Sequence, residues 1–284
     1  MSSPRTFLIT GVSSGLGRAI AEGAMRAGHT VVGTVRREAD ARAFAARSDR
    51  AIARMLDVAD EEAVFATVGE VLGTVGPIDV LVANAGYGQE GTLEESPMQE
   101  LRDQFAVNVF GAVATIKAVL PSMRERRSGH VIGITSMGGL RTFPGLSFYH
   151  GSKYAMEGIL ESLAREVAHV GVHVTAVAPG GFRTDWAGRS MVRTRNTIAD
   201  YDDVVGPLSA NREANSGKQL GDPVRAAQAV LAIVEASAPP RHLLLGSDAL
   251  RLVAQGRAEL QRDIDAWEEL SRSTDIEGAY QIAS

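Results

Sequence analysis

Apolar runs of strand length alternate with longer helical patterns along most of the chain. Strands are expected at residues 5–10, 30–35, 51–56, 78–83, 130–135, 173–178 and 242–246. Helices are expected between them, at 15–27, 61–72, 101–126, 148–169 and 223–237. This alternation favours a parallel sheet with helices on both faces. The sequence therefore predicts a single α/β domain, a doubly wound parallel sheet of about seven strands.

The turn after the first apolar run is rich in glycine and leads directly into a helical pattern. Glycine lets the backbone approach a ligand closely, and a helix N-terminus offers free N–H groups and partial positive charge to a pyrophosphate. A glycine-rich segment can be no more than a turn, but its place between the first strand and the first helix favours a dinucleotide site. The expected contacts are Gly11, Ser13, Ser14, Gly15, Leu16 and Gly17.

The end of the second expected strand bears on which dinucleotide would bind. A carboxylate there would hold the ribose hydroxyls of NAD and repel the 2′-phosphate of NADP. Here Val35 is followed by Arg36 and Arg37, so two guanidinium groups are available instead of an acid. The sequence favours NADP(H), with NAD(H) possible; the alternative interpretation is two exposed arginines that begin a loop.

Tyr149 and Lys153 are spaced one helical turn apart on the same face. A tyrosine of pKa about 10 is a poor base, but a nearby ammonium and an oxidised nicotinamide would favour the phenolate and lower that pKa. The pair alone also fits an amphipathic helix surface. Ser136 at the end of an apolar run, and Asn108 inside a long apolar helix where its amide needs a partner, favour an active site.

Together these motifs resemble those of the short-chain dehydrogenases/reductases. Ala83 stands where the family often has a first asparagine, Ser14 where many NADP-preferring members have a basic residue, and the tail beyond Gly246 is longer than the family core requires. The resemblance covers residues 5–246 and rests on Thr10-Gly11-x-x-x-Gly15-x-Gly17, Leu56-Asp57-Val58, Asn84-Ala85-Gly86, Asn108, Ser136, Tyr149-x-x-x-Lys153 and Pro179-Gly180 with Thr184.

The resemblance implies a Rossmann-type fold and a role for each motif. Arg36 would hold the 2′-phosphate, Asp57 the adenine amino group and Lys153 the nicotinamide ribose. Asn108 would bend its helix and hold a water in a proton relay to Lys153. Further cofactor contacts would come from Arg37, Val58, Asn84, Ala85, Gly86, Tyr149, Pro179, Gly180 and Thr184. Two alternatives stay open: Asp57 as the cap of the next helix, and Asn108 as a satisfied core amide.

The motifs predict an NADP(H)-dependent oxidoreductase that interconverts a ketone or aldehyde and the alcohol, with Tyr149 as proton donor or acceptor and Ser136 at the substrate oxygen. The alternatives are an NAD-linked alcohol or steroid-type dehydrogenase and a non-catalytic cofactor-sensing protein. A bulky, largely apolar substrate is indicated by Leu140, Phe143, Phe182, Trp186 and Met191. His150, about 100° around the helix from Tyr149, is expected to point away from the chemistry.

Two segments depart from the alternation. Residues 184–221 combine apolar and charged side chains without a clear period, and they are expected to form a substrate lid that ends at Asp222, a helix cap, and Pro223, in the first turn. Residues 248–284 form a C-terminal helical extension in which Leu260, Ile264 and Trp267 share one helix face. By family resemblance the long helices at 101–126 and 148–169 are expected to form a homodimer or homotetramer.

Composition excludes several other classes of protein. A net charge of -5 gives no reason to expect nucleic acid. The absence of cysteine excludes disulfides and cysteine metal sites, and the six histidines lack metal-ligand spacing, so no metal is predicted. No signal-peptide pattern and no apolar run near ~20 residues are found. The expectation is a cytoplasmic protein without a membrane partner.

Overall fold

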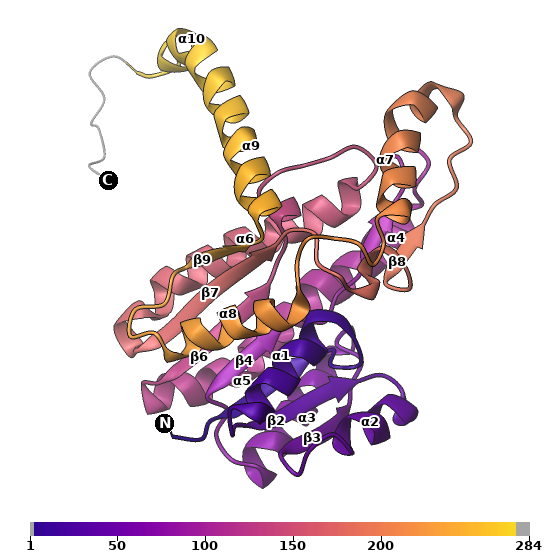
Figure 1. Ribbon diagram of the computed structural model, residues 1–284. Helices are drawn as coiled ribbons and strands as arrows, with labels where there is room; N and C mark the ends of the chain where they lie inside the picture. The colour runs from indigo at the N-terminus through magenta and orange to yellow at the C-terminus, as the bar shows by residue number, and fades with distance from the viewer. Residues whose placement is uncertain (1–2, 277–284) are drawn as a thin grey trace.

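The computed structural model describes residues 3–276 and confirms the predicted doubly wound sheet. Seven parallel strands lie in the order β3-β2-β1-β4-β6-β7-β9 (Figure 1). The chain order reverses between β1 and β4, and such a switch point opens a crevice at the carboxyl ends of the strands. The strands are β1 (Thr6–Thr10), β2 (Thr30–Val35), β3 (Ala51–Met55), β4 (Val80–Ala83), β6 (Gly129–Ile134), β7 (Val172–Pro179) and β9 (His242–Leu245).

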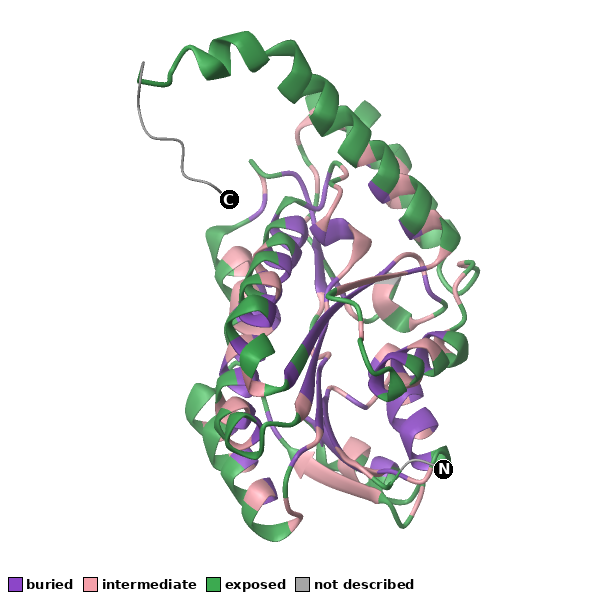
Figure 2. Ribbon diagram, turned by 90° about the vertical axis from the view of Figure 1, so that its left-hand side faces the viewer, coloured by how far each residue is buried: buried purple, intermediate pink, exposed green. Residues whose placement is uncertain are grey.

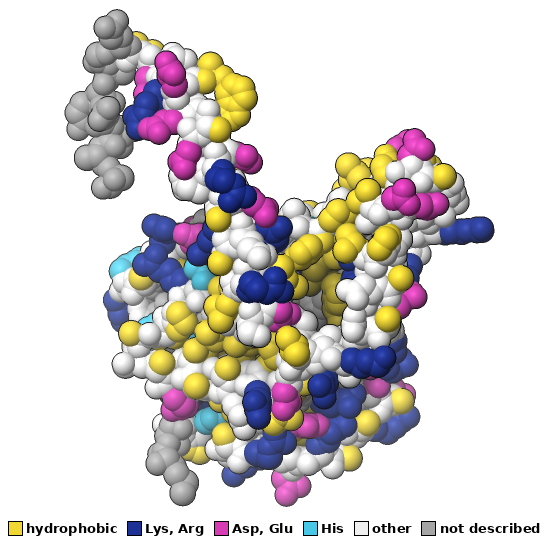
Figure 3. Space-filling model, turned by 45° about the horizontal axis from the view of Figure 1, so that its top comes forward, with side chains coloured by type: hydrophobic (Ala, Val, Ile, Leu, Met, Phe, Trp, Pro, Cys, Tyr) yellow, Lys and Arg dark blue, Asp and Glu magenta, His cyan; other side chains and the backbone are white. Residues whose placement is uncertain are grey.

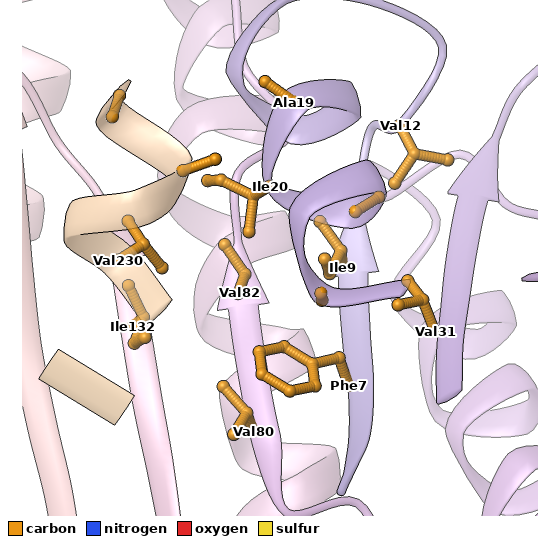
Figure 4. Packing of buried hydrophobic residues seen from close by; sticks show 14 of the residues in the cluster. Phe7, Ile9, Val12, Ala19, Ile20, Val31, Val80, Val82, Ile132 and Val230 are labelled. Carbon is orange, nitrogen blue, oxygen red and sulfur yellow. The ribbon is translucent and has the colours of Figure 1, made fainter. Parts of the chain in front are cut away.

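Successive residues of each strand supply two separate cores. In β1, Phe7 and Ile9 face the layer formed by α1 (Gly15–Arg26) and α8 (Pro223–Glu235), as Figure 4 shows for the residues around Ile20 and Val230. Leu8 faces the opposite layer. That layer comprises α3 (Glu61–Thr74), α5 (Ala112–Arg126) and α6 (Ser147–Val167). Burial on both faces explains why the strands read as continuous apolar runs.

The helix expected at 101–126 is not one regular helix. It consists of α4 (Met98–Phe105), a π-helical segment η1 (Ala106–Gly111) and α5. By length and composition alone, Met98–Arg126 could cross a membrane, because one 18-residue window of it has a mean hydropathy of 1.5, although its apolar residues form no unbroken run of ~20. Its Ile116, Val119 and Met123 are instead part of the protein core against the sheet.

The segment expected as a lid contains more regular structure than its sequence indicated. It includes η4 (Asp185–Ala187), β8 (Met191–Arg193), η5 (Ala199–Tyr201) and α7 (Asp202–Ala214). β8 pairs in parallel with β5 (Gly88–Glu90), which forms a second, two-stranded sheet. At its end, the Asp222 side chain accepts a hydrogen bond from Val224 N at 2.8 Å and Pro223 begins α8, as predicted.

The described part of the C-terminal extension is mostly helical and projects from the body of the protein (Figure 1), while residues 277–284 of the expected extension lie outside the described residues. α9 (Ser247–Ala266) begins directly after β9 and is followed by α10 (Glu268–Arg272). Only its first turns are buried, through Ala249 and Val253, and the rest is exposed (Figure 2). The predicted stripe of Leu260, Ile264 and Trp267 lies in the exposed part. Three further elements are α2 (Glu38–Ala45), η2 (Met137–Gly139) and η3 (Ala168–Val170).

Candidate active site

A large cavity lies at the carboxyl edge of the sheet, around the switch point between β1 and β4. Its volume of ≈ 1230 Å³ exceeds the ~300–1,000 Å³ of ordinary ligand pockets. It extends from Arg36 and Asp57 at one end to Tyr149 and Leu208 at the other, and Figure 3 shows a hollow between α9 and the segment carrying α7, with hydrophobic side chains on its walls. A cavity of this size can hold a dinucleotide and a substrate together.

The glycine-rich turn is held tightly against the loop after β4. Gly11 has a φ of +74°, and a Cβ at Gly17 would lie 2.4 Å from Asn84 Nδ2. The Asn84 amide donates to Thr10 O at 2.8 Å, and the Thr10 hydroxyl accepts from Ala85 N at 2.9 Å. The sequence therefore needs glycine at both positions and a polar side chain at Asn84 to join the two loops.

The start of α1 provides the features of a phosphate site. Ser14, at the N-cap position, makes no side-chain hydrogen bond to the first turn, and Ser13, Ser14 and Gly15 line the cavity. The N–H groups of that turn are therefore available to an anion, and the helix dipole favours one. These residues, with the length of the cavity, fit a nicotinamide dinucleotide.

The two arginines after β2 both line the cavity but differ in their partners. Arg37 pairs with Asp40 through hydrogen bonds of 2.7 and 3.0 Å, and this contact raises the pKa of Arg37 while lowering the pKa of Asp40. Arg36 is exposed at the cavity wall. The two arginines thus differ: the guanidinium of Arg37 is paired with a carboxylate, and Arg36 is an exposed residue of the cavity wall.

Asp57 lines the cavity, as Arg36 does, and does not cap α3. Asp60 has that role, because its side chain accepts a hydrogen bond from Ala63 N at 3.0 Å. Asp57 Oδ1 instead accepts from Ala59 N at 3.1 Å, and Asp57 lines the cavity. The capping alternative for Asp57 is therefore wrong.

Tyr149, Ser136 and Lys153 lie together at the other end of the cavity. Burial raises the pKa of Tyr149 to about 12, against the smaller lowering by its hydrogen bond with Ser136. Lys153 Nζ donates to Ile134 O at 2.9 Å and lies 5.9 Å from the centroid of the Tyr149 ring. Burial lowers the pKa of Lys153 to about 8, and the nearby Glu157 carboxylate opposes that change. In the protein alone, Tyr149 is therefore held protonated. The lowering of its pKa expected from the sequence requires an oxidised nicotinamide beside Lys153, so it stays a prediction for the complex with cofactor.

Asn108 lies in the π-helical segment, 2% exposed, and its amide is fully used. Its Oδ1 accepts from Tyr87 N at 3.0 Å, while its Nδ2 donates to Tyr87 O at 3.0 Å and to Ser152 Oγ at 3.1 Å. The amide thus fixes the loop after β4 to α6. It is a satisfied core amide, and it sits at a helix irregularity of the kind often found at functional sites.

His150 was expected to point away from the chemistry, and this expectation is wrong. It is buried and lines the cavity, where its Nε2 accepts from Phe143 N at 2.9 Å. Its Nδ1 must then carry the proton and donate to Gly138 O at 2.8 Å. Burial lowers the pKa of His150, which keeps the ring neutral. The imidazole thus fixes the loop that follows Ser136.

Nearly all of the residues selected from the sequence reach this one cavity. The exceptions are Gly17 and Asn108, which lie behind its wall, and two of the expected substrate contacts, Leu140 and Met191. The segment 184–221 lines the cavity as expected, but its individual contacts could not be named from the sequence, since α7 has no clear apolar period. The lining residues of that segment include Leu208, Asn211, Arg212, Asn215 and Gln219, and the residues missed outside it include Asp40, His150 and Leu252. Among the residues that the structure describes, no group of three or more His, Cys, Asp or Glu could hold a metal ion.

Comparisons with known proteins show the family of this chain. Residues 5–193 match the family model of short chain dehydrogenases. Oxidoreductase BOA17 of Botryotinia fuckeliana is 35% identical over 269 residues, which cover 94% of this chain and 98% of that protein. The 3-ketodihydrosphingosine reductase of Bacteroides thetaiotaomicron is 37% identical over 201 residues, covering 70% of this chain and 72% of that protein.

Solved structures give the same result. A short-chain dehydrogenase from Streptomyces avermitilis superposes with a TM-score of 0.90 at 40% identity, covering 97% of this chain and 100% of that one. Two neighbours at 25% identity carry cofactors. They are a Thermococcus sibiricus alcohol dehydrogenase with 5-hydroxy-NADP (TM-score 0.70; 86% and 96% covered) and a Burkholderia phymatum enzyme with NAD (TM-score 0.78; 91% and 95% covered).

The fold, the cavity and these comparisons define an oxidoreductase that acts on CH–OH or C=O groups with a nicotinamide cofactor. The chain belongs to the short-chain dehydrogenase family.

Proposed function

We propose that the protein reduces the carbonyl group of a bulky, largely apolar ketone or aldehyde with NADPH, and that Tyr149 donates the proton. The observation that carries this proposal is the meeting of Tyr149, Ser136 and Lys153 at the end of a cavity whose other end holds Arg36. A phenol with a pKa of about 12 is protonated at neutral pH, as a proton donor must be. The reverse oxidation uses the same groups.

Each side chain at this end has a separate task in the proposed reaction. A bound NADPH supplies the hydride. Ser136 holds the carbonyl oxygen beside Tyr149, whose hydroxyl gives its proton to that oxygen as negative charge develops on it. The Lys153 ammonium stabilises the phenolate that remains. A buried site raises the strength of these interactions, and Tyr149 is 6% exposed.

The walls of the cavity support a large apolar substrate. Around Tyr149 lie Met137, Phe143, Leu146, Trp186 and Leu208. The Trp186 ring centroid is 5.1 Å from that of Tyr149. The similar 3-ketodihydrosphingosine reductase has a name that denotes a keto compound as its substrate. Long-chain and polycyclic ketones are therefore the first compounds to test.

The proposal is tested by the absorbance change of NADPH and NADH with a panel of carbonyl compounds. We expect kcat/KM to rise with the apolar size of the ketone and to be higher with NADPH. Reduction only of small polar aldehydes would contradict the substrate class. Higher kcat/KM with NADH would favour the alternative, an NAD-linked alcohol or steroid-type dehydrogenase.

We further propose that residues 184–221 act as a lid over the substrate. Trp186 and Met191 pack with Tyr149 and Leu146, so the segment begins at the reacting centre. Hydrogen exchange in α7 should slow when NADPH and a substrate analogue are both bound, because closure buries its backbone. Peptides from β1, already in the core, serve as the internal control. Unchanged exchange in α7 in the ternary complex would rule out the lid.

We also propose that the protein forms a homodimer or homotetramer through η1–α5 and α6. These helices expose Phe110, Tyr154 and Ile159, with exposed fractions of 56%, 45% and 37%. Two-fold pairing of like surfaces is the commonest way to cover such residues. Sedimentation at micromolar concentration should give a multiple of the 30.1 kDa chain mass. A monomer alone would refute the proposed assembly.

A further inference from the structure

The first turn of α9 contacts the loop that follows β7. Asp248 Oδ2 accepts a hydrogen bond from Gly181 N at 2.7 Å. Pro179, Gly180 and Gly181 all line the cavity, on the way to Thr184. The C-terminal extension therefore reaches the wall of the active site through one carboxylate.

The Asp248 carboxylate packs closely against the backbone of three glycines. A Cβ at Gly180 would lie 2.3 Å from Asp248 Oδ1, and a Cβ at Gly246 would lie 2.5 Å from the same atom. At Gly181 the corresponding distance, to Oδ2, is 3.3 Å. A side chain at Gly180 or Gly246 would displace the carboxylate, so the glycines and Asp248 form one fitted contact.

Stabilisation of α9 alone does not explain why Asp248 occupies this position. An acid in the first turn of a helix is stabilised by the helix dipole, and any acid there would meet that need. Within residues 3–276, however, Asp248 Oδ1 is buried and has no hydrogen-bond partner, which costs free energy. The hydrogen bond to Gly181 N stabilises one oxygen of Asp248, while burial of the other oxygen without a partner costs free energy. Positioning of Gly181 by this carboxylate accounts for the arrangement better than stabilisation of the helix alone.

A second contact joins α9 to the opposite wall. Arg141 Nη1 lies 2.7 Å from Glu259 Oε2, and a Cβ at Gly256 would lie 3.1 Å from Arg141 Cδ. Arg141 belongs to the loop that follows Ser136, and Leu252, between the two contacts, lines the cavity. α9 thus connects the loop after β7 with the loop that carries Ser136.

We propose that Asp248 is a positioning residue for the nicotinamide half of the cofactor site. By holding Gly181 N, it sets the place of residues 180–184 relative to Tyr149. The inference rests on the proposed function only for the identity of the ligand. It assigns to the C-terminal extension a part in catalysis that its exposed outer half does not suggest.

The test compares binding of the whole cofactor with binding of its adenosine half. Asp248→Ala should raise the Kd of NADPH about 10-fold, the effect of losing one charge-assisted hydrogen bond, and should lower kcat. The Kd of 2′,5′-ADP, which lacks the nicotinamide, should change less than about twofold, because its site near Arg36 is remote from Asp248. Asp248→Asn keeps an acceptor for Gly181 N and should restore most of the NADPH affinity.

Asp265→Ala, at the exposed far end of α9, is the matched control and should leave both ligands unaffected. If Asp248→Ala does not fold, Asp248→Ser replaces it in the same comparison. Equal weakening of NADPH and 2′,5′-ADP, an asparagine variant as impaired as alanine, or unchanged NADPH binding would each overturn the proposal. If the wild type prefers NADH, the same comparison is made between the Kd of NADH and the Kd of ADP. An error about cofactor preference can then be distinguished from an error about Asp248.

Discussion

Tyr149→Phe is expected to abolish turnover while leaving the affinity for NADPH nearly unchanged. The substitution removes one hydroxyl and keeps the buried ring that packs beside Trp186. The hydroxyl acts mainly in the transition state, where a general acid contributes about 10²–10⁴-fold to the rate. The loss should therefore appear in kcat and not in the Kd of the cofactor.

Tyr154→Phe provides the matched control for this experiment. Tyr154 lies on the same helix, but its side chain is 45% exposed and does not line the cavity. Its replacement keeps the ring that the proposed assembly would cover and removes one hydroxyl from a residue that does not line the cavity, so kcat should stay within about twofold of the wild type. If Tyr149→Phe kept more than about a tenth of the wild-type kcat, another group would have to be the proton donor.

The sequence predicted the type of sheet and the position of its strands, but not the order of the strands. The positions could be predicted because strands buried on both faces consist of nearly continuous apolar residues. Strands such as β2 and β9 contain little except Val, Leu, Thr and Gly, so their place was clear and their ends differed by a residue or less from expectation. The short helix α2 was missed because it lacks such an apolar pattern. Only Phe44 among its residues is buried, so no apolar period was present to find.

Irregular backbone was the second limit of prediction. The apolar pattern of residues 101–126 is continuous, and a π-helical insertion does not interrupt it. The segment ends in a close tertiary contact, because a Cβ at Gly111 would lie 2.4 Å from the Val58 carbonyl oxygen. Contacts between segments so distant in sequence leave no local signal.

The residues of the candidate site also fall into two groups, those that the sequence predicted and those that it did not. Residues that the chain places at strand ends or one helical turn apart, such as Ser136 and the pair Tyr149 and Lys153, were brought together by the fold as expected. Residues that act through backbone contacts across the cavity were not anticipated. His150 and Asp248 are examples, because hydrogen bonds to Phe143 N and Gly181 N depend on loop conformation and not on residue spacing.

The preference for NADPH should depend on Arg36, and Val35→Asp combined with Arg36→Ala should reverse it. A hydrogen bond to a charged phosphate contributes roughly 1.5–3 kcal/mol, which corresponds to about 10- to 150-fold in kcat/KM. Arg36 is exposed at the cavity wall, whereas Arg37 is bound to Asp40 at 2.7 Å. Arg37→Ala alone should therefore reduce the preference less than Arg36→Ala.

The reversal has two physical parts, and both can be measured. Removing the guanidinium of Arg36 lowers kcat/KM for NADPH, and the new carboxylate at position 35 accepts the ribose hydroxyls of NADH and repels the 2′-phosphate. Arg42→Ala is the control, since Arg42 is exposed and pairs with Glu38 on the surface. Its ratio of kcat/KM for the two cofactors should match the wild type. Equal kcat/KM for NADPH and NADH in the wild type would remove the basis of the assignment, because an arginine facing the 2′-phosphate must discriminate between them.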